Sequence, residues 1–232
     1  MKKKLTAIFL AAVAFTATAQ SIVIDQGQPE KLLNYGVRLG FNASNVSNNF
    51  NESIGTQWAL NDWENGVTVG AVVDFNINNC LSVESGLYYQ RRRSDYRNLF
   101  NSEKFYAVEG KRHANFFQIP ILASFRMGIS KNIEGHIDFG PYFAMGFAGK
   151  DVYNVYTDGI EAETLQNIKK DYFGEDGNYH AFDWGFKMGI GALLYDHYYI
   201  GFHYDAGARN TLSIEGTTGV NKAWNFTLGY NF

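Results

Sequence analysis

Charged side chains recur in segments of this sequence where every second residue is otherwise apolar. Such a set can form ion pairs, relay protons or hold a ligand, because each of these chemistries needs charged groups within a few ångströms of one another. We expect the set to form an ionic network that fills an enclosed space, with a proton or ligand path as the alternative. The members are Arg38, Asp74, Glu84, Arg126, Asp138, Asp183, Lys187, Asp205 and Arg209.

Other chemistries have weaker support in the sequence. His136 and His203 share the parity of this set, but their spacing to the neighbouring aspartates matches no recognised metal motif. His113 has no oriented nucleophile and acid beside it, and no phosphate-binding helix follows the glycines at 189 and 191. The single cysteine, Cys80, can form neither a disulfide framework nor a cysteine-based zinc site. We predict no enzyme activity, no metal and no cofactor.

The elements that must position these groups are β-strands. From Asn34 to Asn42, the side chains of Tyr35, Val37, Leu39 and Phe41 share one face, and polar or small residues occupy the other. No charge occurs on the apolar face in any of the eight segments with this pattern. The apolar sets run over residues 35–41, 67–75, 81–89, 117–125, 137–145, 182–192, 200–206 and 224–232.

Eight such strands can close into two kinds of barrel. A water-soluble barrel has its apolar face inside and a charge-dense face in water. Here the polar face is rich in glycine and carries few charges of balanced sign, which suits a confined interior. A charge facing lipid costs about 2–4 kcal/mol at mid-depth, and this explains an uncharged apolar face. The predicted fold is therefore all-β, an eight-stranded antiparallel transmembrane barrel of the outer-membrane type.

The connections between the strands alternate strictly in length. Long stretches, at about residues 43–65, 91–115, 147–181 and 210–222, alternate with short ones at 76–80, 127–132 and 193–198. Outer-membrane barrels have long loops outside the cell and tight turns in the periplasm. We therefore expect both termini in the periplasm. The aromatic C-terminal residue, Phe232, looks like the signal that the barrel-assembly machinery recognises.

The long stretches carry the most individual features of the chain. Residues 91–112 have a net charge of +4 and residues 150–176 a net charge of −4. We expect the two stretches to attract each other, with binding of the arginines to lipopolysaccharide phosphates as the competing interpretation. In residues 158–172 the acidic residues come first and the lysines come last, which is the charge order that stabilises a helix, so we predict a short surface helix there. The expected contacts to lipopolysaccharide, a ligand or an unknown protein partner are Trp58, Trp63, Arg91, Arg92, Arg93 and Tyr172.

The N-terminal residues have the features of a targeting segment. Three lysines precede an apolar run of about 11 residues, too short to cross a bilayer, and Ala17 and Ala19 precede Gln20. We predict a signal peptide at 1–19, a short periplasmic segment at 20–33 and a barrel domain at 34–232. Loss of the leader would change the net charge from −3 to −6, which disfavours nucleic-acid binding. The mean hydropathy of −0.24 argues against a helical membrane protein.

Several short motifs occur in order along the predicted strands. They are Tyr35-Gly36-Val37-Arg38-Leu39-Gly40, Gln118-Ile119-Pro120, Gly140-Pro141-Tyr142, Asp183-Trp184-Gly185 and the Phe-ended last strand. With these motifs the chain resembles the PorT-type outer-membrane β-barrel proteins over most of residues 34–232. The resemblance implies that Pro120 and Pro141 lie within strands, where we expect bulges. The family is named after a secretion-associated member, but most relatives have no assigned activity, so the resemblance implies a fold more than a function.

The sequence thus favours an integral protein of a Gram-negative-type outer membrane with a structural or binding role and no enzyme activity. The alternative is a small pore or a component of secretion or transport. Its expected surroundings are outer-membrane lipid and lipopolysaccharide.

Overall fold

The computed structural model describes residues 24–50, 56–101, 105–157, 160–161, 166–174, 177–213 and 217–232. Eight long antiparallel strands form a closed ring, in which each strand pairs with the next along the chain and β1 pairs with β10. The ring consists of β1 (Leu33–Phe50), β2 (Thr56–Asn78), β3 (Leu81–Asn101), β4 (Phe105–Ser130), β5 (Ile133–Thr157), β8 (Phe182–Leu194), β9 (Tyr198–Gly207) and β10 (Thr217–Asn231). The predicted all-β, eight-stranded antiparallel barrel is confirmed.

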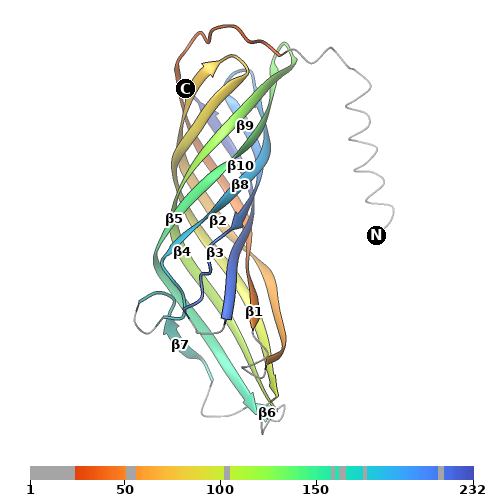
Figure 1. Cartoon of the computed structure of the whole chain (residues 1–232), viewed down its shortest axis with the longest axis vertical. Helices are drawn as coiled ribbons and strands as arrows, with labels where there is room; N and C mark the ends of the chain where they lie inside the picture. Colours follow the sequence, from red (N-terminus) through yellow and green to blue (C-terminus); the bar gives the residue numbers. More distant parts are fainter. Residues whose placement is uncertain are drawn as a thin grey trace, which may run out of the picture.

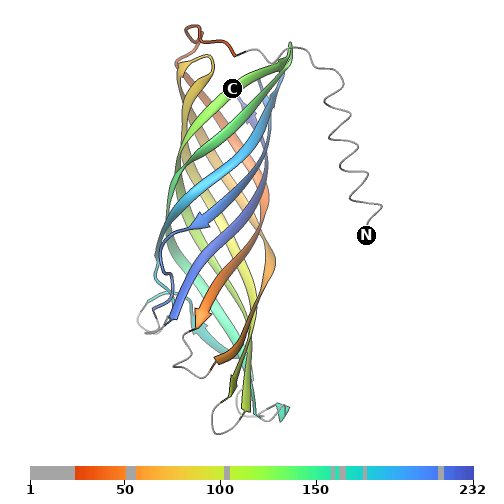
Figure 2. The same ribbon diagram turned by 45° about the vertical axis from the view of Figure 1, so that its right-hand side comes forward.

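The barrel has two unlike ends (Figures 1 and 2). The turn end, at the top of Figure 1, holds the C-terminus and the tight turns that join β2 to β3, β4 to β5 and β8 to β9. The extended end lies opposite, where β2–β5 continue as strands of 21–26 residues while β8–β10 have only 10–15 residues. Ten extra residues add roughly 30 Å along a strand. One wall of the barrel therefore projects beyond the other.

The two faces of the barrel wall differ sharply in chemistry. The outward side chains of Leu39, Phe139 and Ile190 are 64%, 54% and 61% exposed, whereas inward Arg38 and Asp138 are 2% and 1% exposed. This is the reverse of a water-soluble barrel, and a closed ring leaves no unpaired strand edge within a lipid layer. No helix among the described residues is long and apolar enough to cross a membrane.

The predicted long loops are wrong over much of their length. The ladder between β3 and β4 continues through Arg91↔Asn115 to Asn101↔Phe105, and that between β4 and β5 continues to Tyr106↔Thr157. Within 210–222, β10 begins at Thr217. Beyond the apolar belt both faces of a strand meet polar surroundings, so the sequence loses its alternation while the backbone keeps its hydrogen bonds.

The predicted helix at 158–172 is also wrong where the structure describes it. β6 (Ile160–Glu161) and β7 (Ile168–Asp171) are short strands that pair with β5. Beyond its pairing with β8, the edge of β5 offers unpaired backbone groups, which an extended segment satisfies and a helix does not. Residues 158–159 and 162–165 lie outside the described residues.

The expected bulges at the two prolines do not occur. The β3–β4 ladder passes from Ser85↔Ile121 to Tyr88↔Gln118 without a change of register, so the ladder is interrupted at Pro120 but gains no extra residue. The hydroxyl of Ser85 donates to the Pro120 carbonyl at 2.8 Å. Pro141 also lies in an unshifted register with β8. Register shifts fall elsewhere, including one in β2 between Glu64 and Thr68.

The segment before β1 lies against the turn end. The backbone N–H of Asn79 donates to the Gly27 carbonyl at 3.1 Å. The Asp25 carboxylate accepts hydrogen bonds from the backbone N–H of Gly27 and from the side-chain amide of Asn79. These hydrogen bonds lower the pKa of Asp25. The predicted signal peptide at 1–19 lies outside the described residues, as do residues 20–23 of the predicted periplasmic segment.

Candidate functional site

The interior next to the turn end contains a network of charged side chains. Arg126 lies 3.4 Å from Asp74, and Arg38 lies 3.9 Å from Glu84. Asp138 accepts a hydrogen bond from the Ser124 hydroxyl at 2.6 Å and pairs with His203 at 2.9 Å. The strands bring these groups together because inward positions of six different strands meet at one level of a narrow ring. We call this set the turn-end network.

A second network lies nearer the extended end. The Lys187 ammonium donates to Asp205 at 2.8 Å, and Arg92 lies 3.1 Å from Asp183 and 3.5 Å from Asp205. The Gln118 amide adds a hydrogen bond to Asp205 at 3.1 Å. Two cations and two carboxylates balance in this middle network, and both carboxylates have no exposed surface.

Rings and glycines complete the packing of the interior. A Cβ at Gly189 would lie 2.4 Å from the His203 ring, and one at Gly191 would lie 2.7 Å from the Tyr199 hydroxyl. The glycines therefore leave the space that the opposing rings occupy. The Arg38 guanidinium lies 4.0 Å from the centre of the Tyr199 ring. Charged, aromatic and glycine positions thus alternate to fill the interior.

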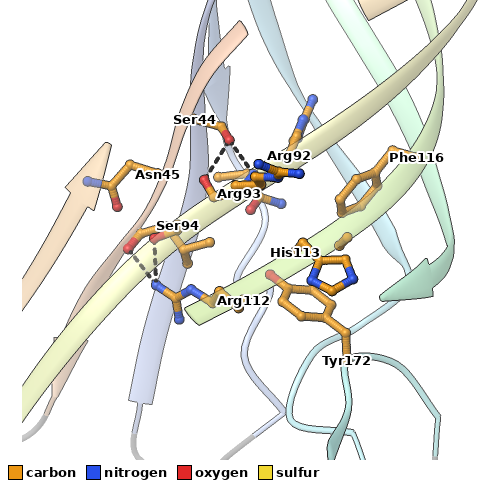
Figure 3. Close-up of a pocket in the computed structure, with 12 residues that line it drawn as sticks. Ser44, Asn45, Arg92, Arg93, Ser94, Arg112, His113, Phe116 and Tyr172 are labelled. Carbon is orange, nitrogen blue, oxygen red and sulfur yellow. Dashed lines mark hydrogen bonds between the residues drawn. The ribbon is translucent and has the colours of Figure 1, made fainter. Parts of the chain in front are cut away.

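A cap of aromatic residues covers the interior at the extended end. The rings of Tyr172 and Tyr179 stack with centroids 4.0 Å apart, and Tyr179 forms a β-bridge with Leu212. Beneath them, Arg112 donates hydrogen bonds to Tyr179, to Asn61 and to Ser94, the last of which is drawn in Figure 3. The structure thus buries Tyr172, which the sequence placed on an exposed loop.

The structure places the other predicted residues as follows. Eight of the nine expected interior charges are buried; Arg209 instead lies half-exposed with its guanidinium 5.3 Å from the centre of the outward Phe182 ring. Arg92, expected at the surface, belongs to the middle network. Trp63 is 44% exposed on β2, and the Trp58 side chain lies outside the described residues.

Sequence reasoning missed the interior roles of Gln90, Arg92, Arg112 and Gln118. A usable signal existed, because Gln90 and Arg92 keep the even-numbered inward parity of Glu84 on β3. That parity continues beyond the point where the apolar alternation stops. Extending the strand by parity would have moved Arg92 into the barrel.

An outward aromatic row marks the end of the apolar belt on the projecting wall. Phe117 and Phe147 stack with centroids 4.8 Å apart, and Tyr89 packs within 6.4 Å of both rings. These residues lie on the adjacent strands β3, β4 and β5. Aromatic rings of this kind collect at the boundary between lipid and water.

A cationic row follows at once on the same three strands. Arg93 is opposite His113 in register, His113 is opposite Lys150, and Arg91 lies two residues before Arg93 on β3. We call these four residues the cationic rim. Within the described chain, no carboxylate oxygen lies within 4.0 Å of Arg91, Arg93 or Lys150, although Glu64 is opposite Arg93 in register. Partial burial and the three neighbouring cations lower the pKa of His113.

Cations farther along the wall behave differently. Arg97 pairs with Glu109 at 2.5 Å and Lys111 pairs with Asp95 at 3.0 Å, in both cases between β3 and β4. The predicted attraction between residues 91–112 and 150–176 produces no ion pair among the described residues. The cationic rim is thus left without partners from the stretch expected to neutralise it.

The fold and this sequence of surfaces define an integral outer-membrane β-barrel protein of the Gram-negative type. Residues 19–231 match the family model described as "Outer membrane protein beta-barrel domain". The chain belongs to this family. A search of curated proteins finds no match.

Several solved structures of small outer-membrane barrels are similar to this chain. The attachment invasion locus protein Ail of Yersinia pestis is 13% identical, with 86% of this chain and 98% of Ail covered and a TM-score of 0.40. OprG of Pseudomonas aeruginosa is 13% identical, with coverages of 90% and 99% and a TM-score of 0.47. Neisserial surface protein A is 8% identical, with coverages of 85% and 95% and a TM-score of 0.36.

Proposed function

We propose that this protein is a closed, non-enzymatic barrel whose cationic rim binds the phosphate groups of lipopolysaccharide in the outer leaflet. The observation that carries the proposal is the unpaired row of Arg91, Arg93 and Lys150 directly beyond the aromatic row. In this proposal the extended end faces outward and both termini are periplasmic. A cleaved signal peptide at 1–19 is part of the same proposal.

The order of chemistries on the wall matches the order of groups in the lipid. Acyl chains of lipid A would contact the apolar belt, and its phosphates lie at the level where the aromatic row ends. Guanidinium groups form strong, charge-assisted hydrogen bonds with phosphate oxygens. A cation with no described carboxylate oxygen within ion-pair distance gains most from such a ligand, which distinguishes the rim from the paired Arg97 and Lys111.

The filled interior supports a closed barrel over the alternative of a small pore. Asp183 and Asp205 have no exposed surface and Arg38, Asp74 and Glu84 are at most 4% exposed, so these levels of the interior have side chains where a pore needs water. We also place the chain in the PorT-type branch of its family, supported by the motifs in β1, β4, β5 and β8. Because the interior is filled, a protein of this branch that takes part in secretion would do so through contacts on the surface of its barrel.

Binding of purified lipid A to the detergent-solubilised protein tests the rim. We expect the double variant Arg91→Gln, Arg93→Gln to bind at least about tenfold more weakly, since a hydrogen bond to a charged group contributes about 1.5–3 kcal/mol. The matched control, Arg97→Gln with Lys111→Gln, removes two cations from the same strands that already have carboxylate partners. We expect it to bind lipid A like the wild type. Equal losses in the two variants would refute a specific rim site.

Conductance in a planar bilayer tests the closed barrel. We expect the wild type to show no steady channels. Reproducible channels of one size would replace this proposal with the pore.

A further inference from the structure

A polar hollow lies on the outer face of the projecting wall, immediately beyond the cationic rim. Moving two residues away from the turn end takes Arg93 to Asp95, His113 to Lys111 and Lys150 to Val152, and these three positions are opposite one another in register. Two residues span roughly 7 Å along a strand. The hollow therefore begins one row past the rim, on the same strands and the same face.

The hollow has the size of a ligand site. Its volume is about 510 Å³, within the range of roughly 300–1,000 Å³ typical of small-ligand pockets. Val152 contributes an apolar patch, while Asn154 and Asn167 contribute groups from β5 and from the residue before β7. The backbone N–H of Asn167 donates a hydrogen bond to the side-chain oxygen of Asn154 at 2.7 Å, and this bond fixes the orientation of the Asn154 side chain.

Four of the five charged side chains that line the hollow are paired with one another, and Asp62 is the fifth. Lys111 is bound to Asp95 and Arg97 to Glu109, so these pairs present fixed donors and acceptors, and the Asp62 carboxylate adds a further acceptor. A hydroxyl group both donates and accepts, so a hydroxyl-rich ligand can use both members of each pair. A protein partner would favour exposed aromatic anchors, but the one aromatic residue in the lining, Tyr96, donates its hydroxyl to the buried Asp151.

We propose that this hollow binds the core oligosaccharide of the lipopolysaccharide molecule whose phosphates occupy the cationic rim. The inference rests on the proposed function, because the rim fixes where the sugar chain begins. The core is attached to lipid A and leads away from the membrane, so a lipid seated at the rim directs its first sugars along β3–β5 into the hollow.

Two glycolipids and two variants test the inference with the full-length protein in detergent. The probes are lipid A and the same lipid A with its core oligosaccharide. We expect the wild type to bind the core-bearing form about tenfold more tightly, the factor that one or two net hydrogen bonds give. Val152→Trp should fill the hollow and abolish this difference while leaving lipid A affinity unchanged. Thr218→Trp, an exposed residue on the far wall, is the matched control and should retain the difference.

The outcomes separate this inference from the proposed function. Equal affinity of the wild type for both glycolipids would overturn the sugar site, even if the rim still binds lipid A. A protein would then be the remaining candidate ligand for the hollow. Loss of the difference in both tryptophan variants would also overturn the sugar site. A third variant, Asn154→Ala, reports on the hollow if Val152→Trp fails to fold, and it should reduce only the affinity that the core oligosaccharide contributes. The proposed function itself would be refuted if the Arg91→Gln, Arg93→Gln variant bound lipid A with the affinity of the wild type.

Discussion

Replacing Asp205 with Asn should destabilise the barrel strongly, because it leaves a buried ammonium without a counter-charge. Asp205 lies 2.8 Å from the Lys187 ammonium, and both side chains are at most 6% exposed. Asn keeps the shape of the side chain and a hydrogen-bonding oxygen, but removes the charge. Within the described residues, Lys187 has no other carboxylate within ion-pair distance.

The size of the effect follows from what each partner retains. Removing one member of a buried ion pair typically lowers the free energy of unfolding by about 3–5 kcal/mol. In the reverse variant, Lys187→Met, Asp205 keeps Arg92 at 3.5 Å and the Gln118 amide at 3.1 Å. We therefore expect Lys187→Met to lose only about 1–2 kcal/mol. The double variant should be more stable than Asp205→Asn alone, because no unpaired charge remains at position 187.

Urea unfolding in lipid vesicles, followed by the difference in gel mobility between folded and boiled protein, measures these changes. Lys111→Met is the control, since the lysine side chain of its pair with Asp95 is 82% exposed and solvent screening leaves such surface pairs little effect on stability. The reasoning would be refuted if Asp205→Asn were as stable as this control. It would also fail if the effects of the two interior substitutions simply added.

Three further predictions concern the wall, the rim and the cap. A Cβ at Gly140 would lie 2.0 Å from the Ile121 carbonyl oxygen, so Gly140→Ala should lower the free energy of unfolding by about 1–3 kcal/mol in urea titrations; an unchanged midpoint would contradict this. Burial and the neighbouring cations lower the pKa of His113, so its imidazole should gain a proton at a lower pH than an ordinary histidine does, and lipid A binding should strengthen as the pH falls through that transition. His113→Gln should remove that pH dependence, and an equal rise in this variant would assign the effect to the lipid. Tyr172→Ala removes a buried stacked ring and should destabilise the protein by about 3 kcal/mol and make the chain at residues 172–174 and 177–180 accessible to protease, whereas wild-type resistance would contradict a packed cap.

The membrane-facing part of the barrel could be predicted from the sequence because a strand between lipid and a polar interior alternates apolar and polar residues with a period of two. Every outward side chain there meets hydrocarbon and every inward one meets a narrow polar interior, so faces and strand order follow from alternation. The same signal fails beyond the aromatic row. Strands β3 and β4 continue through Arg97 and Glu109 with polar residues on both faces, so local sequence there resembles a loop.

The interior could be predicted by parity but not by pairing. Parity identifies Asp183, Lys187 and Asp205 as inward residues, yet which cation meets which carboxylate depends on the stagger of eight strands around the ring. Arg92 shows the consequence, since it pairs across the barrel with Asp183, 91 positions away in the sequence.

The sequence by itself determined the class of protein, the inward and outward residues of the belt, and the presence of a cationic stretch near residues 91–93. Parity along β3 would have turned Arg92 inward and Arg91 and Arg93 outward, but only the tertiary structure decided that Arg93 lies opposite His113 and that His113 lies opposite Lys150. The physical reason is that a row of side chains across a sheet is formed by strand register, which joins residues distant in the chain. The aromatic row, the cationic rim and the hollow beyond it are all such rows.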